Sequence, residues 1–366
     1  NISGGGDIAQ YYLSVSYNYE KGLLKVDNLN NFNNNIDINR YNLRANVNMN
    51  ITKTTEIAVK FYSLIDRYNG PIEDANAIFA SVMQANPVNF PKYYEKDEET
   101  QFLNHTLFGN KGNGGYPNPY ADMVRGYKDR FTSTILSQVQ INQDLDFITE
   151  GLQFRGMASI RSYSMNENSR GFTPFYYGLS EVDTEEGVLY SLYQIQEGTE
   201  FLNDAVIANQ ANSSFYFEMI GQYDRTFGQN HNVGALLVFT RKESLNTIAG
   251  SSTYSTLPSR NMGFSGRFTY AFDGRYLTEF NFGYNGSEKF AENNRFGFFP
   301  SAGIGWLISN ESFFAGLKDV ITNLKLKATY GLVGNDAISD PNDRFFYLSD
   351  VNLNDGSRGY TFGEDF

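Results

Sequence analysis

The sequence predicts an all-β protein, a transmembrane antiparallel β-barrel with long loops at one end and short turns at the other. Three observations predict it. Apolar and polar residues alternate over stretches of about ten positions, aromatic residues make up 16% of the chain beside 34 glycines, and short and long connections follow one another in turn. A transmembrane β-strand needs roughly 9–11 tilted residues, apolar toward lipid and polar toward a wet lumen.

The alternation is clearest between residues 41 and 51. Its odd positions are apolar: Tyr41, Leu43, Ala45, Val47, Met49 and Ile51. Its even positions are polar: Asn42, Arg44, Asn46, Asn48 and Asn50. Because successive side chains of a strand point to opposite faces, Asn42, Arg44, Asn46 and Asn48 are expected to face the lumen and the odd positions lipid. A soluble sandwich can show the same alternation, but this run is longer than an ordinary strand of ~5–6 residues.

The other elements follow the same pattern in chain order. Strands are expected over residues 8–19, 41–51, 55–65, 131–145, 152–163, 213–227, 232–241, 263–272, 276–286, 296–308 and 323–332. Short turns are expected at 52–54, 146–151, 228–231 and 273–275, and long excursions at 67–130, 164–211 and 242–257. All the short turns then lie on one side, as the periplasmic turns of outer-membrane barrels do, and the long loops lie on the extracellular side.

Parity fixes two of the turns. Pairing Ile51 with Thr55 keeps the apolar faces of both strands together, because a slip of one residue would exchange the faces. The Asp273-Gly274 pair alone suggests a two-residue turn. The aromatic positions on both sides of it instead require an odd loop, which predicts three residues, 273–275. In the first long excursion, residues 73–85 have apolar residues at helical spacing before Pro87, which predicts a short helix.

Composition excludes several other classes. The chain of 366 residues carries a net charge of −12, which argues against a nucleic-acid surface. It has no cysteine, so a disulfide scaffold and thiolate metal sites are excluded. The sequence has no run of ~18 apolar residues that would form a membrane-spanning helix. It opens without a signal peptide, and we expect neither end to be a natural terminus.

Signals for enzyme chemistry are weak. His105 and His231 are the only histidines, and the turn pattern places them on opposite sides, so no catalytic triad or histidine metal site is expected. A weak calcium candidate remains, because oxygen ligands gather near the end of the chain, although their spacing is not that of an EF-hand. Its carboxylates are Asp336, Asp340 and Asp343. We therefore expect neither an enzyme nor a cofactor.

Two stretches resemble a known family closely. They are NMGFSGRFTYAFDGRYLTEFNFGYNGSEKFAENNRFGFFPSAGIGWLISNESFF at 261–314 and LKLKATYGLVGND at 324–336. Both are similar to the SusC/RagA-type TonB-dependent outer-membrane transporters of Bacteroidetes. Weaker matches are YYLSVSYNYEKGL at 11–23, RYNLRANVNMN at 40–50 and NPYADMVRGY at 118–127, so that the resemblance spans most of the chain.

The resemblance implies a fold and a function beyond what the strand pattern gives. Residues 1–366 would form about half of a 22-stranded barrel, and the plug domain, the TonB box and the terminal strands would lie outside them. The whole protein would import oligosaccharides or oligopeptides through the outer membrane of a Gram-negative bacterium, with a SusD-like lipoprotein as its lid. The alternative is a non-transporting surface protein that binds glycans or peptides or mediates adhesion.

Aromatic residues concentrate in the two longest loops, and three roles are open for them. They could pack the loops over the barrel mouth, contact the lid lipoprotein, or contact the substrate, since exposed aromatic rings stack on sugars and anchor protein interfaces. The candidates for lid or substrate contact are Tyr93, Tyr94, Tyr116, Tyr120, Phe175, Tyr176 and Tyr177.

Overall fold

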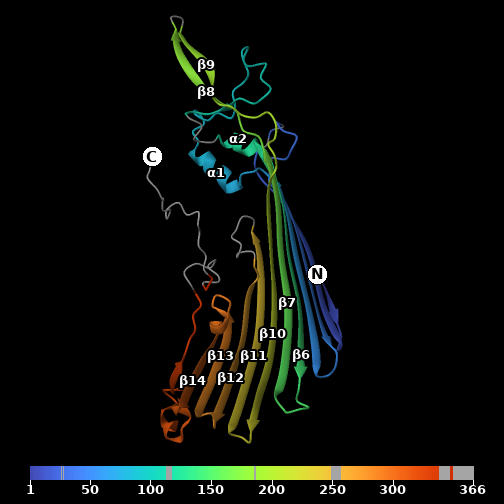
Figure 1. The fold of residues 1–366 in the computed structure, drawn as a ribbon, viewed down its shortest axis with the longest axis vertical. Coiled ribbons are helices and arrows are strands. Elements are labelled where there is room, and N and C mark those ends of the chain that lie inside the picture. The colour runs from blue at the N-terminus through green and yellow to red at the C-terminus, as the bar shows by residue number, and fades with distance from the viewer. Residues whose placement is uncertain are drawn as a thin grey trace, which may run out of the picture.

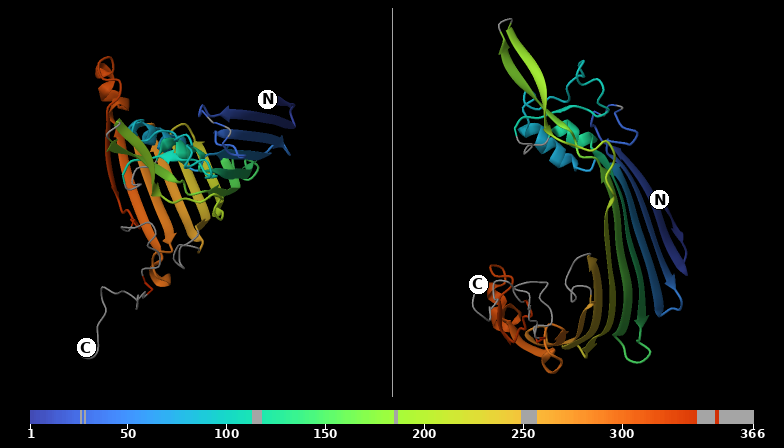
Figure 2. Two further views of the ribbon diagram at one scale, coloured as in Figure 1. Left: turned by 90° about the horizontal axis from the view of Figure 1, so that it is seen from above. Right: turned by 45° about the horizontal axis from the view of Figure 1, so that its top comes forward.

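The computed structural model describes residues 1–25, 27, 29–112, 118–184, 187–248, 257–337 and 347–348. Twelve strands form one antiparallel sheet in the order β1-β2-β3-β4-β6-β7-β10-β11-β12-β13-β14-β15. The sheet is long and strongly curved, and the loops gather at one end of it (Figures 1 and 2). The predicted all-β fold is confirmed, with the open curved sheet expected of part of a barrel.

Each strand pairs with the next strand of the sheet along the chain. Their bounds are β1 (Ile2–Gly5), β2 (Ala9–Lys21), β3 (Asp37–Asn50), β4 (Thr55–Gly70), β6 (Gly126–Asp144), β7 (Leu152–Gly171), β10 (Val206–Phe227), β11 (His231–Ile248), β12 (Ser259–Phe272), β13 (Tyr276–Ser287), β14 (Phe296–Leu307) and β15 (Lys325–Gly331). A second, three-stranded sheet has the order β5-β8-β9. Its strands are β5 (Phe108–Gly109), β8 (Tyr176–Thr184) and β9 (Gly187–Gln196).

The register of the large sheet keeps one face apolar across many strands. Tyr11 of β2 pairs with Val47 of β3, which pairs with Val59 of β4, and Val59 pairs with Val139 of β6. Near the other edge, Phe268 pairs with Phe280. Because directly opposed residues share a face, the odd positions of β3 belong to a continuous apolar surface.

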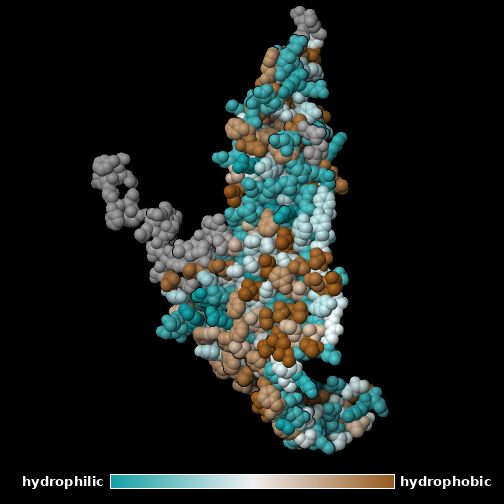
Figure 3. All heavy atoms as spheres, turned by 90° about the vertical axis from the view of Figure 1, so that its right-hand side faces the viewer, coloured by the Kyte–Doolittle hydropathy of each residue, from teal (hydrophilic) through white to brown (hydrophobic). Residues whose placement is uncertain are grey.

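That surface forms an apolar band at mid-height on the outer side of the sheet, between hydrophilic regions above and below it (Figure 3). Its side chains are exposed in this chain, as Val15, Tyr17, Val139 and Ile160 show. A large exposed apolar surface of this kind marks a face that meets lipid or another apolar partner. Among the described residues, no helix combines the length and the apolar character that a membrane span requires.

Both turn predictions from parity are confirmed. Met49 pairs with Ile57, and the Ile51 amide donates to the Thr55 carbonyl at 2.9 Å, which leaves 52–54 as the turn. Phe272 pairs with Tyr276, so the loop between them has three residues. Asp273 and Gly274 have φ of 54° and 61° there, in the left-handed region. Parity over many residues therefore outweighs the turn type that a single Asp-Gly pair suggests.

Two of the expected long loops are shorter than predicted. β7 continues to Gly171 and β10 starts at Val206, and the β8–β9 hairpin lies inside the remaining excursion. β11 likewise continues to Ile248, into the segment expected as a loop. Apolar alternation stops where the lipid would stop, but the ladder continues because hydrogen bonding between strands does not depend on which side chains they carry.

The first long loop forms helices over the sheet's upper end. α1 (Ala75–Gln84) matches the helix expected over 73–85. α2 (Pro119–Val124) was not predicted, although Asn118 caps it and Pro119 starts it. At the short-turn end, the 308–324 connection holds two 3-10 helices, η2 (Ile308–Asn310) and η3 (Ser312–Leu317).

Candidate functional site

α1, α2, β5 and the start of β8 share a small apolar core. We call these four elements together the loop cap. Buried apolar side chains from these four elements meet in it: Ile78, Phe108, Ala121, Met123, Val124 and Tyr176. Phe108 lies at its centre, with its ring centroid 6.3 Å from that of Tyr120 and 6.4 Å from that of Phe172. Residues from loops far apart in the sequence thus form one packed unit, which positions the surface above it.

Buried asparagines fasten the loop cap to its surroundings. Asn118 is fully buried, and its Oδ1 accepts from the Tyr120 and Ala121 amides while its Nδ2 donates to the Pro91 and Gly109 carbonyls at 2.7 and 2.8 Å. Each of these hydrogen bonds replaces one that the side chain would make with water. Asn118 is therefore buried without an unsatisfied polar group. The sequence signal for this residue was the Asn-Pro pair before a helical run, which indicates a helix start.

Asn34 makes the corresponding link from the loop between β2 and β3. Its Nδ2 donates to the carbonyls of Met123 and Gly126, at 3.3 and 3.2 Å. Asn30 adds a bond to the Val124 carbonyl at 2.7 Å. The asparagine-rich segment between β2 and β3 is therefore a structural partner of α2.

The predicted aromatic residues divide into exposed and buried ones. Tyr93 is 40% exposed, and its ring lies 6.2 Å from that of Tyr120. Lys92 lies over both rings, 4.4 Å from the Tyr120 centroid, and pairs with Asp27. Burial and the hydrogen bond that Tyr120 donates to Asp27 raise the pKa of Tyr120, while Lys92 lowers the pKa of Asp27. This group presents a polar and aromatic surface at the outer edge of the loop cap.

Phe175, Tyr176 and Tyr177 lie deeper. Tyr176 and Tyr177 are each 5% exposed, and burial raises the pKa of Tyr176 to about 12. Phe175 stacks on His105 with centroids 3.6 Å apart, and His105 Nε2 lies 2.8 Å from the Tyr177 hydroxyl. Packing inside the loop cap accounts for all three positions, and contact with a lid or substrate stays a prediction for them.

Of the other two aromatic candidates, Tyr94 is the one that the structure describes. Tyr94 pairs with Leu107 in an isolated antiparallel bridge, and burial raises its pKa. Tyr116 lies outside the described residues. The structure brings Tyr93 and Tyr120 together, buries Tyr176 and Tyr177, and half-buries Phe175 against His105.

The loop cap sits on the polar face of the large sheet. Lys128 of β6 donates to Asp74, which precedes α1, at 3.0 Å. Lys128 and Gln138 occupy the same face of β6, since both are even positions, and the latter pairs with Lys60 opposite Asn46. The face that carries Asn46 is therefore the one that the loops cover. The other predicted lumen positions share it: Asn42, Arg44 and Asn48. That this face borders a water-filled lumen stays a prediction.

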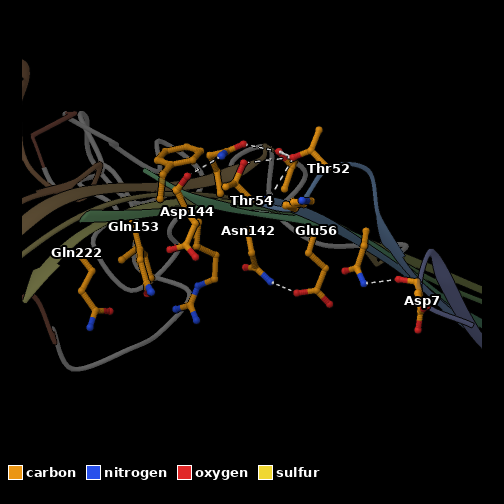
Figure 4. A pocket seen from close by; sticks show the side chains of 15 residues that line it. Asp7, Thr52, Thr54, Glu56, Asn142, Asp144, Gln153 and Gln222 are labelled. Atoms are coloured by element: carbon orange, nitrogen blue, oxygen red, sulfur yellow. Dashed lines mark hydrogen bonds between the residues drawn. The ribbon is translucent and has the colours of Figure 1, made fainter. Parts of the chain in front are cut away.

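A polar cavity of about 660 Å³ lies on this face near the short turns. Figure 4 shows Glu56, Asn142 and Gln222 on the same side of the ribbon, with Asn142 donating to Glu56 at 3.0 Å. Asn50 donates to the Asp7 carbonyl at its edge. The cavity is thus lined by amides and carboxylates from five strands, and it suits polar ligands or a polar protein segment.

A buried carboxylate at the short-turn end was not predicted. Glu311 accepts from the Tyr276 hydroxyl at 2.8 Å, from the Trp306 indole at 2.9 Å and from Arg275 at 2.9 Å. Hydrogen bonding from Trp306 and Tyr276 is the main cause that lowers its pKa. The three donors lie on β13, β14 and the turn before β13, so Glu311 fastens the 308–324 connection to the sheet. The aromatic pair with an arginine was the only sequence signal for it.

No metal centre is found in the part of the chain that the structure describes, since no three His, Asp or Glu side chains there gather as a metal site would require. Of the calcium candidates, Asp336 is exposed and accepts at its carbonyl from Lys289. Asp340 and Asp343 lie outside the described residues. His105 and His231 lie at opposite ends of the sheet, as predicted, and His231 is bonded to Tyr270.

The sequence is similar to those of known TonB-dependent receptors. No protein-family model matches the sequence. TonB-dependent receptor P26 of Formosa agariphila is 23% identical over 93% of this chain and 32% of its own length. TonB-dependent receptor SusC of Bacteroides thetaiotaomicron is 23% identical over 100% of this chain and 36% of its own. The chain thus spans about a third of the length of the curated relatives it matches.

Solved structures show the same fold. The RagAB peptide importer in its 'closed-closed' state superposes with a TM-score of 0.53 and 17% identity, over 90% of this chain and 35% of that chain. A second structure of the RagAB peptide transporter gives a TM-score of 0.52 with 16% identity. The curved sheet described above is therefore the fold found in part of these barrels.

Proposed function

We propose that the whole protein is a SusC/RagA-type TonB-dependent outer-membrane transporter, as its similarity to such proteins supports, and that it imports oligosaccharides or oligopeptides. The observation that carries the proposal is the two-faced sheet, which has an apolar outer band and a polar inner face under a packed loop cap. A barrel built this way meets lipid on one side and encloses a polar passage on the other. Its work is binding and gating, with no covalent chemistry.

We propose that residues 1–366 form one part of the barrel and that the plug domain and the segment that contacts TonB lie elsewhere in the same polypeptide. The support is the matched share of the relatives, about a third of their length. It is also physical, because β1 and β15 have no outer partner strand among the described residues, and lipid cannot satisfy the backbone groups of an open edge. Expressed alone, residues 1–366 should aggregate rather than form a heat-modifiable monomer.

A SusD-like lipoprotein would close the barrel from the extracellular side. The surface of the loop cap around Lys92 supports this, since Tyr93 is exposed there beside Tyr120. Aromatic anchors at a protein interface typically cost upward of ~2 kcal/mol when truncated. The Tyr93→Ala, Tyr120→Ala double variant of the full-length protein should co-purify with less lipoprotein. Tyr41→Ala, on the outer face of the sheet, is the matched control.

The proposal is tested by uptake. Cells that express the full-length protein and its partner take up fluorescent peptide and oligosaccharide pools, with and without functional TonB. Import that stops without TonB supports transport. Surface binding that persists without any TonB-dependent uptake would favour the non-transporting adhesion protein instead. The pool that is taken up distinguishes peptide from glycan.

A further inference from the structure

Three basic side chains cross the polar face of the large sheet at the middle of its strands. Arg44 of β3, Tyr62 of β4, Leu136 of β6 and Arg161 of β7 are directly opposed in register and form one row. Lys60 lies in the next row, two residues from Tyr62 along β4. We call Arg44, Lys60 and Arg161 the basic band. It lies below the loop cap and above the polar cavity that contains Glu56.

The basic band is free of ion pairs among the described residues, while several other cations on the same face are paired. Arg44, Lys60 and Arg161 are exposed, and no salt bridge to any of them occurs among the residues that the structure describes. Arg44 makes one cation–π contact, with its guanidinium 5.6 Å from the Tyr62 ring centroid. Paired cations of this face include Arg40 with Asp66 at 2.8 Å, Lys128 with Asp74 at 3.0 Å, and Arg130 with Glu167 at 3.7 Å.

Most carboxylates near the basic band already have a cationic partner, and Glu56, four residues from Lys60 along β4, accepts from Asn142 beside the polar cavity. Asp66 accepts from Arg40, and Glu167 lies beside Arg130. Glu218 accepts from the Tyr216 hydroxyl at 2.7 Å and lies 3.8 Å from an Arg155 nitrogen. The unneutralised charge at mid-height is therefore positive, although the whole chain carries −12. Its position on a concave protein wall strengthens the field, because a lined cleft focuses potential.

The spacing of the basic band suits a polymer. Neighbouring strands lie about 4.8 Å apart, so three strand steps separate Arg44 and Arg161 by roughly 14 Å along the wall. A single small anion cannot contact both backbone positions at once. An extended chain that carries an anionic group at regular intervals can contact them in turn, and the flexible side chains accommodate its movement.

We propose that the basic band binds the anionic groups of an acidic oligomer as it passes along the inner wall, and that it makes the transporter selective for acidic over neutral oligomers. The proposal rests on the import function proposed above and names the charge class of its solute. Carboxylates or sulfates would supply the negative charge. Lysine would act as a point charge, and arginine could bind either group through two parallel hydrogen bonds.

The test uses the full-length transporter with its lipoprotein partner, purified in detergent. The probes are a labelled peptide of alternating Glu and Ser and its Gln-Ser counterpart of equal length, and a dextran sulfate oligosaccharide with the matching neutral dextran. The band variant is R44Q/K60Q/R161Q. Its control, K21Q/R67Q/K318Q, removes the same charge from the opposite face and from the end of η3.

We expect the wild type to bind an acidic probe more tightly than its neutral counterpart, with an affinity that falls as salt rises. The band variant should bind the acidic probe about tenfold more weakly, from three exposed charge contacts of modest strength each. The control should bind as the wild type does. Whether the peptide or the sulfated sugar responds identifies the source of the negative charge.

Equal affinity for acidic and neutral probes in the wild type, or equal binding by the band variant and its control, would overturn the proposal. TonB-dependent uptake of neutral peptides would in that case leave the import function standing. If the band variant keeps its probe affinity but loses thermal stability relative to its control, the cations pair with an acidic segment of the same polypeptide, and the proposal also fails. Absence of any uptake by the wild type would reject the import function itself.

Discussion

Truncating Phe108 tests whether the loop cap is a separate packed unit on the sheet. The side chain is 2% exposed and lies between the rings of Tyr120 and Phe172. Replacing a buried Phe by Ala removes its transfer free energy and leaves a cavity, a loss of ~3–5 kcal/mol. The sheet does not share this core, because its strands are held by their own ladders. Phe108→Ala should therefore open the loop cap and leave the sheet intact.

Hydrogen exchange in the full-length protein measures this locally. A loss of ~3 kcal/mol in the free energy of opening corresponds to more than ~100-fold faster exchange in α1 and α2. Amides of β4 should keep their protection, and heat-modifiable migration of the barrel should be unchanged. Phe201→Ala is the control, since that side chain is 70% exposed. Exchange that rises equally in β4, or does not rise in α1 and α2, would refute the reasoning.

Further perturbations test the outer face, the loop cap and the short-turn end. Val47→Arg should lower the free energy of unfolding by about 2–4 kcal/mol if position 47 lies near the bilayer midplane. A thiol reagent in the aqueous phase should label a cysteine at position 46 and spare one at position 47. The reverse labelling pattern would show that the two faces of β3 are assigned the wrong way round. Burial raises the pKa of Asp122 to about 6, so the folded cap favours the protonated form and loses stability as pH rises from about 4 to about 6. Asp122→Asn should therefore raise the free energy of opening of α2 by roughly 1–3 kcal/mol at pH 7, seen as slower exchange, and have no effect below pH 4. Equal effects at both pH values would contradict the assignment. Glu311→Gln should weaken the bond from Arg275, and exchange over 308–324 should become faster. Unchanged exchange there would show that the carboxylate charge is not needed.

The period of two in the strands was sufficient to predict the sheet and its faces. Residues 41–51 alone predicted which side chains share a face, and parity alone predicted the register across 52–54 and across 273–275. These features depend on local geometry, because a strand's side chains alternate wherever it lies. The sequence also predicted α1, since its apolar residues recur at helical spacing before a proline.

Strand ends and the interior of the loops depended on the tertiary structure. β7 and β11 continue past the apolar alternation because β6 and β10 supply hydrogen bonds there, which no pattern within either strand records. Tyr176 is buried and Tyr93 exposed although both are loop tyrosines, because α1, α2 and β5 converge on the former. Burial depends on which other segments of the chain pack against a residue, whereas alternation depends on the strand alone. The sequence therefore predicted the large sheet, and only the tertiary structure determined the loop cap.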